Sequence, residues 1–163
     1  MEEKLLRVEH LKKYFKTPKG QLHAVDDVTF SIGRGKTLGV VGESGCGKST
    51  LGRVSIKLIP ATDGAVFFEG KNILEAKENM QQRRDMQIIF QDPFTSIDPR
   101  MSVSETIAEP LKVHRLCKSK ADLNQRVKNL MDTVGLASRF YNSYPHEMDG
   151  GRRQRIGIAR ALA

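Results

Sequence analysis

The sequence has 163 residues, of which 39% are hydrophobic and 28% charged, and its formal net charge is +8. This balance is typical of one globular domain with a single core and excludes a disordered or fibrous chain. No stretch approaches the roughly 18 apolar residues of a membrane span. The charged N-terminal residues MEEK have no apolar segment behind them, so we expect no signal peptide.

We therefore expect a protein of the cytoplasm. Cys46 and Cys117 form no metal-ligand pattern, so we expect both to be reduced thiols. The basic charge is dispersed, apart from one dense cluster of Arg152, Arg153, Arg155 and Arg160. No aromatic side chains are interleaved with this cluster for stacking on bases. We therefore interpret it as a solvated helix face rather than a nucleic-acid groove.

The spacing of apolar residues predicts the strands. Alternating patterns or short apolar runs indicate strands at Leu5–Glu9, Ala24–Ile32, Thr37–Val41, Ala65–Glu69 and Met86–Phe90. We expect Leu5–Glu9 to be an edge strand. Thr37–Val41 and Met86–Phe90 are expected to be buried, because short apolar runs suit strands that are covered on both faces.

Helices are predicted in four segments. They are Ser49–Leu58, Glu75–Arg84, Ser119–Val134 and Arg152–Ala163, the second because its residues are polar and helix-prone and the others because of their apolar spacing. Gly135 is expected to cap the third of these at its C-terminus. The fourth is expected to pack through Ile156, Ile158, Ala159 and Leu162. A loop rich in Pro and Asp, Gln91–Arg100, follows the predicted strand Met86–Phe90.

A glycine-rich loop lies between the predicted strand Thr37–Val41 and the helix after it. The residues that match the pattern G-x-x-x-x-G-K-[ST] are Gly42, Glu43, Ser44, Gly45, Cys46, Gly47, Lys48 and Ser49, and Thr50 follows directly. A buried strand before the loop and a helix after it are the context in which this pattern binds a nucleotide. We therefore expect this segment to bind ATP and Mg²⁺.

The residue types of the loop suit this chemistry. Its glycines let the backbone curve so that N–H groups point at the phosphates, and the helix N-terminus favours an anion. Lys48 would reach the β- and γ-phosphates as a mobile charge, and the Ser49 hydroxyl would bind Mg²⁺, which prefers oxygen ligands. Cys46 is expected to contribute its backbone.

The loop sequence GESGCGKST resembles that of ABC ATPases, in particular the ATPase subunits of oligopeptide and dipeptide importers. The segment Leu11–Phe15 is similar to the family segment that stacks an aromatic ring on adenine, which implies this role for Phe15, with Tyr14 as the alternative. MQIIFQDPFTSIDPR, residues 86–100, resembles the Q-loop segment. The resemblance implies that Gln91 contacts Mg²⁺ and the attacking water, and it continues through residues 101–114.

The last segment, YPHEMDGGRRQRIGIARALA, is similar to the family's signature segment. The resemblance implies that Asp149, Gly150, Gly151 and Arg152 contact the γ-phosphate of ATP held by another subunit. Asp149 stands where Ser is usual, and Arg152 where Gln is usual. A carboxylate here would repel phosphate unless Arg152 or Arg153 offsets its charge.

The family resemblance also implies the fold class, α/β. We expect a P-loop NTPase (RecA-like) core with an N-terminal antiparallel β-subdomain and a helical subdomain, incomplete at the C-terminus. The expected parts are 5–75 (the β-subdomain with the phosphate loop), 76–91 (a core strand and the Q-loop), 92–151 (the helical subdomain) and 152–163 (the signature helix).

The family continues with an apolar strand ending in Asp-Glu, whose Glu is the general base, and with a histidine that contacts the γ-phosphate. The sequence has no such strand, and none of its four histidines is placed for that role. We therefore expect a truncated chain that lacks the general base. Such a chain should bind nucleotide weakly and hydrolyse it poorly or not at all.

The function implied by the resemblance is that of an ABC-type ATP hydrolase subunit that couples ATP binding and hydrolysis to peptide import. Its implied partners are a second ATPase subunit, membrane-spanning permease subunits and, indirectly, an extracytoplasmic peptide-binding protein. The implied location is the cytoplasmic face of the cell membrane. Phe94 and Ile97, after Gln91, are expected to dock on the permease. Two alternatives stay open, a non-transport ABC ATPase acting on nucleic acid and a non-catalytic nucleotide-binding module.

Overall fold

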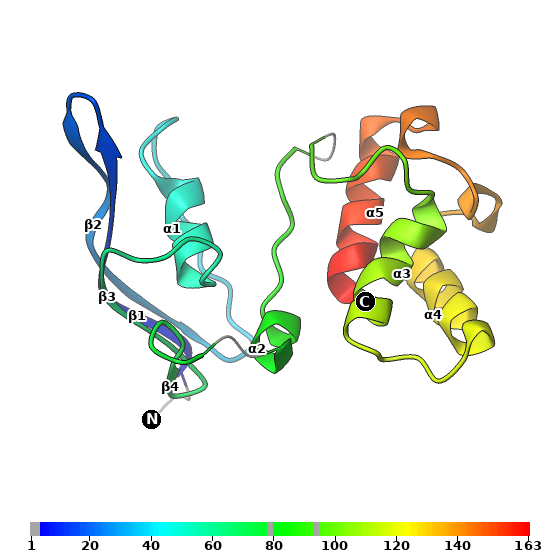
Figure 1. The fold of residues 1–163 in the computed structure, drawn as a ribbon, viewed down its shortest axis with the longest axis horizontal. Helices are drawn as coiled ribbons and strands as arrows, with labels where there is room; N and C mark the ends of the chain where they lie inside the picture. The colour runs from blue at the N-terminus through cyan, green and yellow to red at the C-terminus, as the bar shows by residue number, and fades with distance from the viewer. Residues whose placement is uncertain (1–3, 78–79, 93–94) are drawn as a thin grey trace. The chain divides into compact units, whose positions relative to one another are not determined.

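The computed structural model describes residues 4–77, 80–92 and 95–163. The chain divides into two compact units, Met1–Asn79 and Met80–Ala163, which are described separately (Figure 1). The first unit holds the strands β1 (Lys4–Thr17), β2 (Gly20–Gly33), β3 (Asp63–Phe68) and β4 (Lys71–Asn72) and the helix α1 (Lys48–Ser55). The second unit is helical.

The strands of the first unit form one antiparallel sheet in the order β2-β1-β3-β4. The expectation of an edge strand at Leu5–Glu9 is wrong, because β1 pairs with β2 on one side and with β3 on the other. Val8 and Leu11 on β1 are fully buried. Burial of these two side chains explains why β1 is central in the sheet.

Helix α1 contacts β1 and β2 and buries Val54. It is shorter than the predicted Ser49–Leu58 because the chain turns after Ser55: Lys57 adopts a left-handed conformation with φ 59°. The Lys57 ammonium then donates hydrogen bonds to the carbonyl oxygens of Ile73 (2.8 Å) and Ala76 (2.6 Å). Lys57 thereby joins the end of α1 to the turn that follows β4.

The two buried strands expected at Thr37–Val41 and Met86–Phe90 are not formed. No strand is assigned to either segment, and Val41 is 94% exposed and Ile89 51% exposed. A strand requires a hydrogen-bonded neighbour. Within the described ranges, the paired strands are β1–β4 alone, so both segments lack the partner that would make them strands.

The second unit contains α2 (Met80–Asp85), α3 (Val103–Val113), α4 (Lys120–Thr133) and α5 (Gly150–Leu162), with short 3₁₀ turns at Ser138–Phe140 and Pro145–Glu147. Figure 1 shows α3, α4 and α5 packed against one another. The buried side chains of their shared core are Ile97, Val103, Ile107, Ala108, Leu111, Val127, Met131, Leu136, Met148, Ile156 and Ala159.

Capping fixes the ends of the second unit's helices. The predicted helix Ser119–Val134 is confirmed as α4, with Ser119 as N-cap, Val134 as C-cap and Gly135 next at φ 69°. The predicted helix Arg152–Ala163 is confirmed as α5, which begins two residues earlier. It packs through Ile156 and Ala159 as expected, whereas Ile158 is only half-buried and Leu162 is 57% exposed. The predicted helix Glu75–Arg84 is wrong at its start, because residues 75–77 are not helical and α2 begins at Met80.

Helix α3 begins at a capping box that the apolar spacing did not signal. The Glu105 N–H donates to the Ser102 hydroxyl oxygen (3.3 Å), and the Ser102 N–H donates to the Glu105 carboxylate (2.8 Å). The sequence signal was present as S-x-x-E before an apolar run. The hydrogen bond from the Ser102 N–H, and a second one of 2.8 Å that the Ser102 hydroxyl donates to the same carboxylate, lower the pKa of Glu105.

Candidate nucleotide-binding site

The phosphate loop leads directly into α1, whose N-cap is Gly47 and whose first residue is Lys48. Gly47 has φ 96°, and a Cβ atom there would lie 2.0 Å from the Ala24 carbonyl oxygen on β2. Only glycine combines this conformation with such a close approach. The loop therefore packs against β2 at a point that excludes any side chain.

The Lys48 ammonium lies within the loop. It donates hydrogen bonds to the carbonyl oxygens of Gly42 (2.8 Å) and Glu43 (2.6 Å) and lies 3.7 Å from the Cys46 sulfur. Because the first intrahelical hydrogen bond runs from the Leu51 N–H to the Gly47 carbonyl, the N–H groups before Leu51 are the unpaired donors of the helix N-terminus. The loop thus presents a cation and a helix N-terminus together.

This set of groups fits a magnesium nucleotide. The helix N-terminus and Lys48 supply the donors and positive charge that phosphate oxygens need. Ser49 is exposed in the first turn of α1 and carries the hard oxygen that Mg²⁺ prefers. No group of three or more His, Cys, Asp or Glu side chains within residues 4–77, 80–92 and 95–163 could hold a metal ion alone.

The two candidate aromatic residues on β1 differ in their surroundings. The Tyr14 ring stacks on His23 with 3.9 Å between centroids, and its hydroxyl donates to the Asp26 carboxylate. That hydrogen bond raises the pKa of Tyr14 to about 12 and lowers the pKa of Asp26. Phe15 is half-buried, with the Lys13 ammonium 4.9 Å from its ring centroid. Tyr14 is thus held by β2 residues, whereas Phe15 is not part of that cluster.

The signature residues begin α5. Asp149 is its N-cap: the carboxylate accepts the Arg152 N–H (2.8 Å) and pairs with the Arg152 guanidinium (3.1 Å). The two departures from the family pattern therefore contact each other. A Cβ atom at Gly150 would meet nothing within 4 Å, and one at Gly151 would make only an ordinary contact, so the described fold itself does not require these two glycines.

Gln91 and the segment after it belong to the second unit. The Gln91 side chain is exposed. Phe94, expected on the docking surface, lies outside the described residues. Ile97, expected on the same surface, is instead 4% exposed and belongs to the helical core. The apolar side chain of Ile97 is therefore explained by packing in the helical core and not by contact with a permease.

Comparison with protein families gives a match to the ABC transporter family over residues 25–163. The chain belongs to this family. The signature and phosphate-loop segments described above both fall within the match.

Relatives of this ABC transporter chain include oligopeptide transport ATP-binding proteins OppF. The protein from Bacillus subtilis (strain 168) is 55% identical over 166 residues, which cover 100% of this chain and 54% of the relative. The OppF protein from Salmonella typhimurium is 52% identical over 153 residues, which cover 93% of this chain and 46% of the relative. The chain thus spans about half the length of the curated relatives it matches.

Solved ABC cassettes have the same fold. The dimeric ATP-binding cassette MJ0796, in a post-hydrolysis state bound to ADP and Pi, matches with TM-score 0.86 and 25% identity over 97% of this chain and 69% of that chain. The structure of cbiO1 from Clostridium perfringens, part of the ABC transporter complex cbiONQ, matches with TM-score 0.77 and 26% identity. The match covers 99% of this chain and 62% of that chain. These likenesses confirm the predicted fold class.

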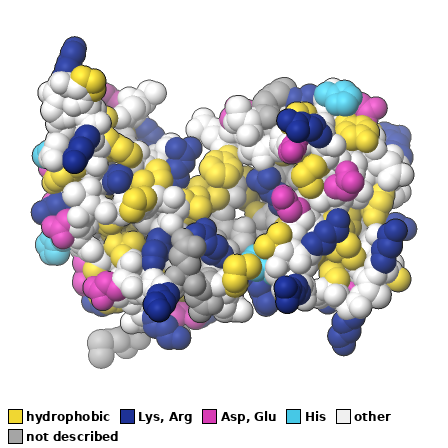
Figure 2. Space-filling model, viewed as in Figure 1, with side chains coloured by type: hydrophobic (Ala, Val, Ile, Leu, Met, Phe, Trp, Pro, Cys, Tyr) yellow, Lys and Arg dark blue, Asp and Glu magenta, His cyan; other side chains and the backbone are white. Residues whose placement is uncertain are grey.

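The surface of this ABC chain bears on the nucleic-acid alternative. Figure 2 shows Lys and Arg side chains scattered over the drawn face, interspersed with acidic and hydrophobic ones. The relatives named above are peptide-transport proteins, so the nucleic-acid alternative is not favoured. No helix in the described parts of the chain has the length and apolar character needed to cross a membrane.

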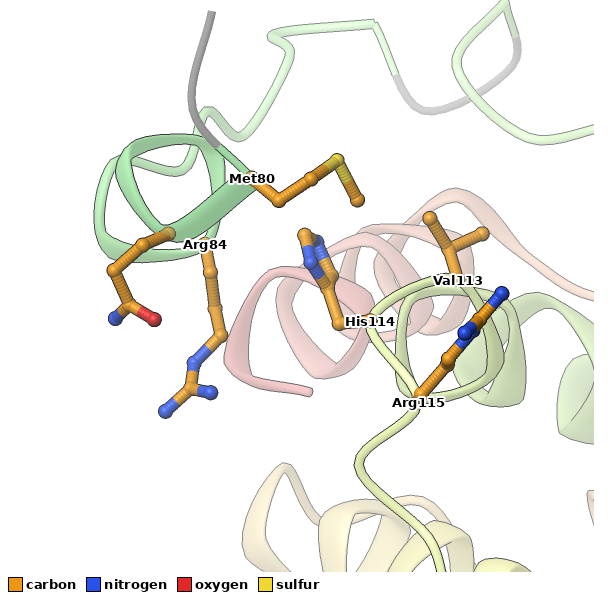
Figure 3. A pocket seen from close by; sticks show the side chains of 6 residues that line it. Met80, Arg84, Val113, His114 and Arg115 are labelled. Atoms are coloured by element: carbon orange, nitrogen blue, oxygen red, sulfur yellow. The ribbon is translucent and has the colours of Figure 1, made fainter.

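A pocket of about 360 Å³ lies between α2 and the C-terminal end of α3. Figure 3 shows Met80 of α2 extending toward the end of α3, with His114, Arg84 and Arg115 around the same hollow. Met80 is 53% exposed and Val113 is 57% exposed. The residues that line this pocket combine exposed apolar groups with basic groups and include no carboxylate.

One link between two motifs was not predictable from the sequence. The Arg160 guanidinium on α5 donates a hydrogen bond of 2.7 Å to the carbonyl oxygen of Ser96, 64 residues earlier. Ser96 lies in the segment that follows Gln91, so the signature helix is tied directly to that segment. No local pattern encodes a bond to a backbone carbonyl at this separation.

Proposed function

We propose that this chain is the nucleotide-binding part of an ATPase that drives oligopeptide import, with Mg-ATP bound at the phosphate loop. The observation that carries the proposal is the Lys48 ammonium held within the loop at the N-terminus of α1, 2.8 Å from the Gly42 carbonyl oxygen. The names of the relatives support peptide transport. ATP hydrolysis and peptide import are proposed for the whole protein.

The roles in nucleotide binding follow from the chemistry of each group. Backbone N–H groups of Gly42–Gly47 and of the first turn of α1 would donate to phosphate oxygens. Lys48 would exchange its carbonyl partners for the β- and γ-phosphates, and Ser49 would bind Mg²⁺. Gln91 would complete the metal contacts and orient the attacking water through its neutral amide. Bound Mg²⁺ would neutralise charge on the phosphates.

Adenine recognition is assigned to Phe15. Tyr14 is already stacked on His23 and hydrogen-bonded to Asp26, which favours Phe15 as the ring that stacks on the base. Replacing Phe15 with Ala should weaken binding of ATP without changing binding of inorganic tripolyphosphate, which has no base. Equal weakening of both ligands would contradict this assignment.

The signature segment is proposed to act across a subunit interface. Asp149, Gly150, Gly151 and Arg152 would approach the γ-phosphate held by a second ATPase subunit. The open space around Gly150 supports this role, because nothing in the described fold requires a glycine there. The Asp149–Arg152 ion pair offsets the carboxylate's repulsion of phosphate.

The other proposed partners are permease subunits, with the protein peripheral at the cytoplasmic face of the membrane, and indirectly a peptide-binding protein. The pocket of Figure 3, with exposed Met80 and Val113, is a better docking candidate than buried Ile97. Its basic lining suits a permease segment that carries a carboxylate beside an apolar side chain.

Hydrolysis is proposed to require a general base outside these residues. The chain alone should therefore bind Mg-ATP without steady phosphate release, and release at the rate of a working transporter would contradict this. The import function is tested by uptake of a labelled oligopeptide in bacteria that lack their own import ATPase. The whole protein should restore uptake and its Lys48→Ala variant should not. Equal uptake with both proteins would contradict ATP-driven import.

A further inference from the structure

The β1–β2 hairpin continues beyond the rest of its sheet. The pairing of β1 with β3 ends at Lys12, which pairs with Asp63, whereas the pairing of β1 with β2 continues to Thr17, which pairs with Gly20. Figure 1 shows this end of the two strands projecting past β3. A two-stranded hairpin is at best marginally stable by itself. The position of the residues on this projection therefore depends on interactions outside the strand ladder.

A cluster of side chains holds Tyr14 at the start of the projection. The rings of Tyr14 and His23 stack with 3.9 Å between centroids and 13° between their planes. The Tyr14 hydroxyl donates to one oxygen of the Asp26 carboxylate, and the His23 Nδ1 atom lies 3.3 Å from the other oxygen. The Tyr14 N–H donates to the Thr62 hydroxyl oxygen (2.9 Å). Tyr14 is thereby held through its ring, its hydroxyl and its backbone.

Phe15 follows Tyr14 directly and pairs across the hairpin with Leu22, the residue before His23. Successive side chains of a strand point to opposite faces, so a fixed Tyr14 ring on one face also fixes the orientation of Phe15 on the other. Phe15 is half-buried and Leu22 is 56% exposed. The cluster thus fills one face of the hairpin with its own side chains, whereas the Phe15 face stays accessible to a ligand.

The cluster also adjoins the phosphate loop. His23 and Asp26 line a pocket of about 350 Å³ together with the loop residues Gly47 and Lys48. The close approach of Gly47 to the carbonyl oxygen of Ala24 fixes the residue after His23 against the loop. The base of the projecting hairpin is therefore held beside the proposed site for the phosphates.

We propose that Tyr14, His23 and Asp26 are positioning residues for the adenine base, which hold the hairpin so that Phe15 presents its ring to the nucleotide. The inference rests on the proposed assignment of Phe15 to adenine. The three residues act through Phe15 and not by contact with the nucleotide. A hairpin that is ordered before the ligand arrives loses less conformational freedom on binding. Loss of the cluster should therefore weaken recognition of the base and leave recognition of the phosphates unchanged.

The test is a calorimetric titration of each variant with Mg-ATP and with Mg-tripolyphosphate, which has no base. Phe15→Ala should weaken ATP binding about tenfold, because stacking on an aromatic ring contributes at least that much. Tyr14→Phe keeps the stacked ring and removes the hydroxyl, so it should weaken ATP binding about threefold with unchanged tripolyphosphate binding. Asp26→Asn should act in the same direction. The matched control is Asp27→Asn, at the adjacent carboxylate that pairs with His10 at 2.8 Å, and it should change neither affinity.

A double variant shows whether Tyr14 acts through Phe15. In a chain that already carries Phe15→Ala, adding Tyr14→Phe should cause no further loss of ATP affinity, because residues that act as one unit are not additive. A further threefold loss would mean that Tyr14 contacts the nucleotide directly and would overturn the positioning role.

Two other results overturn the inference while leaving the adenine assignment intact. One is an unchanged ATP affinity in folded Tyr14→Phe when Phe15→Ala weakens it. The other is equal weakening of ATP and tripolyphosphate by Tyr14→Phe, which would mean a general loss of structure. An unchanged ATP affinity in Phe15→Ala would overturn the adenine assignment itself and the inference with it.

Discussion

The Lys48 ammonium lies 2.6 Å from the carbonyl oxygen of Glu43, so the phosphate loop holds its own cation at short range. A second hydrogen bond, to Gly42, fixes the ammonium between two carbonyl groups of the loop. Lysine is a flexible point charge with three donors. It can move from these neutral acceptors to phosphate oxygens, which bind it more strongly because they are charged.

Gly47 and Gly52 form a matched pair for testing the loop. A Cβ atom at Gly47 would lie 2.0 Å from the Ala24 carbonyl oxygen, whereas one at Gly52 in α1 would meet nothing within 4 Å. Gly47→Ala should destabilise the chain by more than about 1 kcal/mol and abolish ATP binding. Gly52→Ala should stabilise it by about 0.5–1 kcal/mol with unchanged ATP affinity. Thermal unfolding and nucleotide titration of both variants check this, and similar behaviour of the two would contradict the packing of the loop on β2.

The capping box at α3 makes stability depend on acid. Ser102→Ala should cost about 1 kcal/mol. Because the pKa of Glu105 is lowered in the folded chain, its contribution is present above the ordinary glutamate pKa and is lost as the pH falls through the lowered value. Ser102→Ala removes the hydroxyl hydrogen bond to Glu105 but keeps the backbone N–H, which is the larger cause of the lowered pKa, so it should flatten the acid limb of the stability curve only in part. An acid limb unchanged by Ser102→Ala, measured by urea unfolding at a series of pH values, would contradict this account.

Tyr14 should titrate at unusually high pH. The Asp26 carboxylate accepts a hydrogen bond from the Tyr14 hydroxyl, and this raises the pKa of Tyr14 to about 12. A raised tyrosine pKa stabilises the folded chain below the ordinary value near 10 and loses this effect as the pH rises through about 12. Asp26→Asn should return the titration, followed by tyrosinate absorbance, toward the ordinary range. Asp132→Asn on α4 is the control and should leave the Tyr14 titration unchanged; an equal change in both would refute the assignment.

Substitutions at Ile97 and at Val113 distinguish a role in core packing from a role in docking on the permease. Ile97→Asp places a carboxylate at a site that is 4% exposed and should destabilise the helical unit by about 3 kcal/mol. Val113→Asp changes a side chain that is 57% exposed and should cost no more than about 1 kcal/mol. It should nevertheless weaken assembly with permease subunits in a pull-down. Normal assembly of the folded Val113→Asp variant would exclude the pocket of Figure 3 as the docking surface.

Local patterns were sufficient for several elements. The helix α4 followed from its apolar spacing and from Ser119 and Gly135 at its ends. The phosphate loop followed from Lys48 and Ser49 at fixed distances from glycines. In each case the determining interactions lie within a few residues, so a single sequence contains them.

Long-range pairing was not predictable in the same way. The apolar runs at Thr37–Val41 and Met86–Phe90 indicate strands only if other strands lie beside them, and no local pattern supplies those neighbours. Likewise, the central place of β1 depends on its pairing with β3, which is distant in sequence. The Asp149–Arg152 contact was foreseen only as a possible charge offset, and its geometry required the start of α5 to be known.

The central claim is nucleotide binding through Lys48. The most direct measurement is a calorimetric titration of Mg-ATP into the parent chain, its Lys48→Ala variant and a Lys19→Ala control in the exposed β1–β2 turn. We predict saturable binding to the parent and the control, with binding to Lys48→Ala lost. Equal binding to all three chains, or none to the parent chain when it is folded, would contradict the assignment of this loop as the nucleotide site.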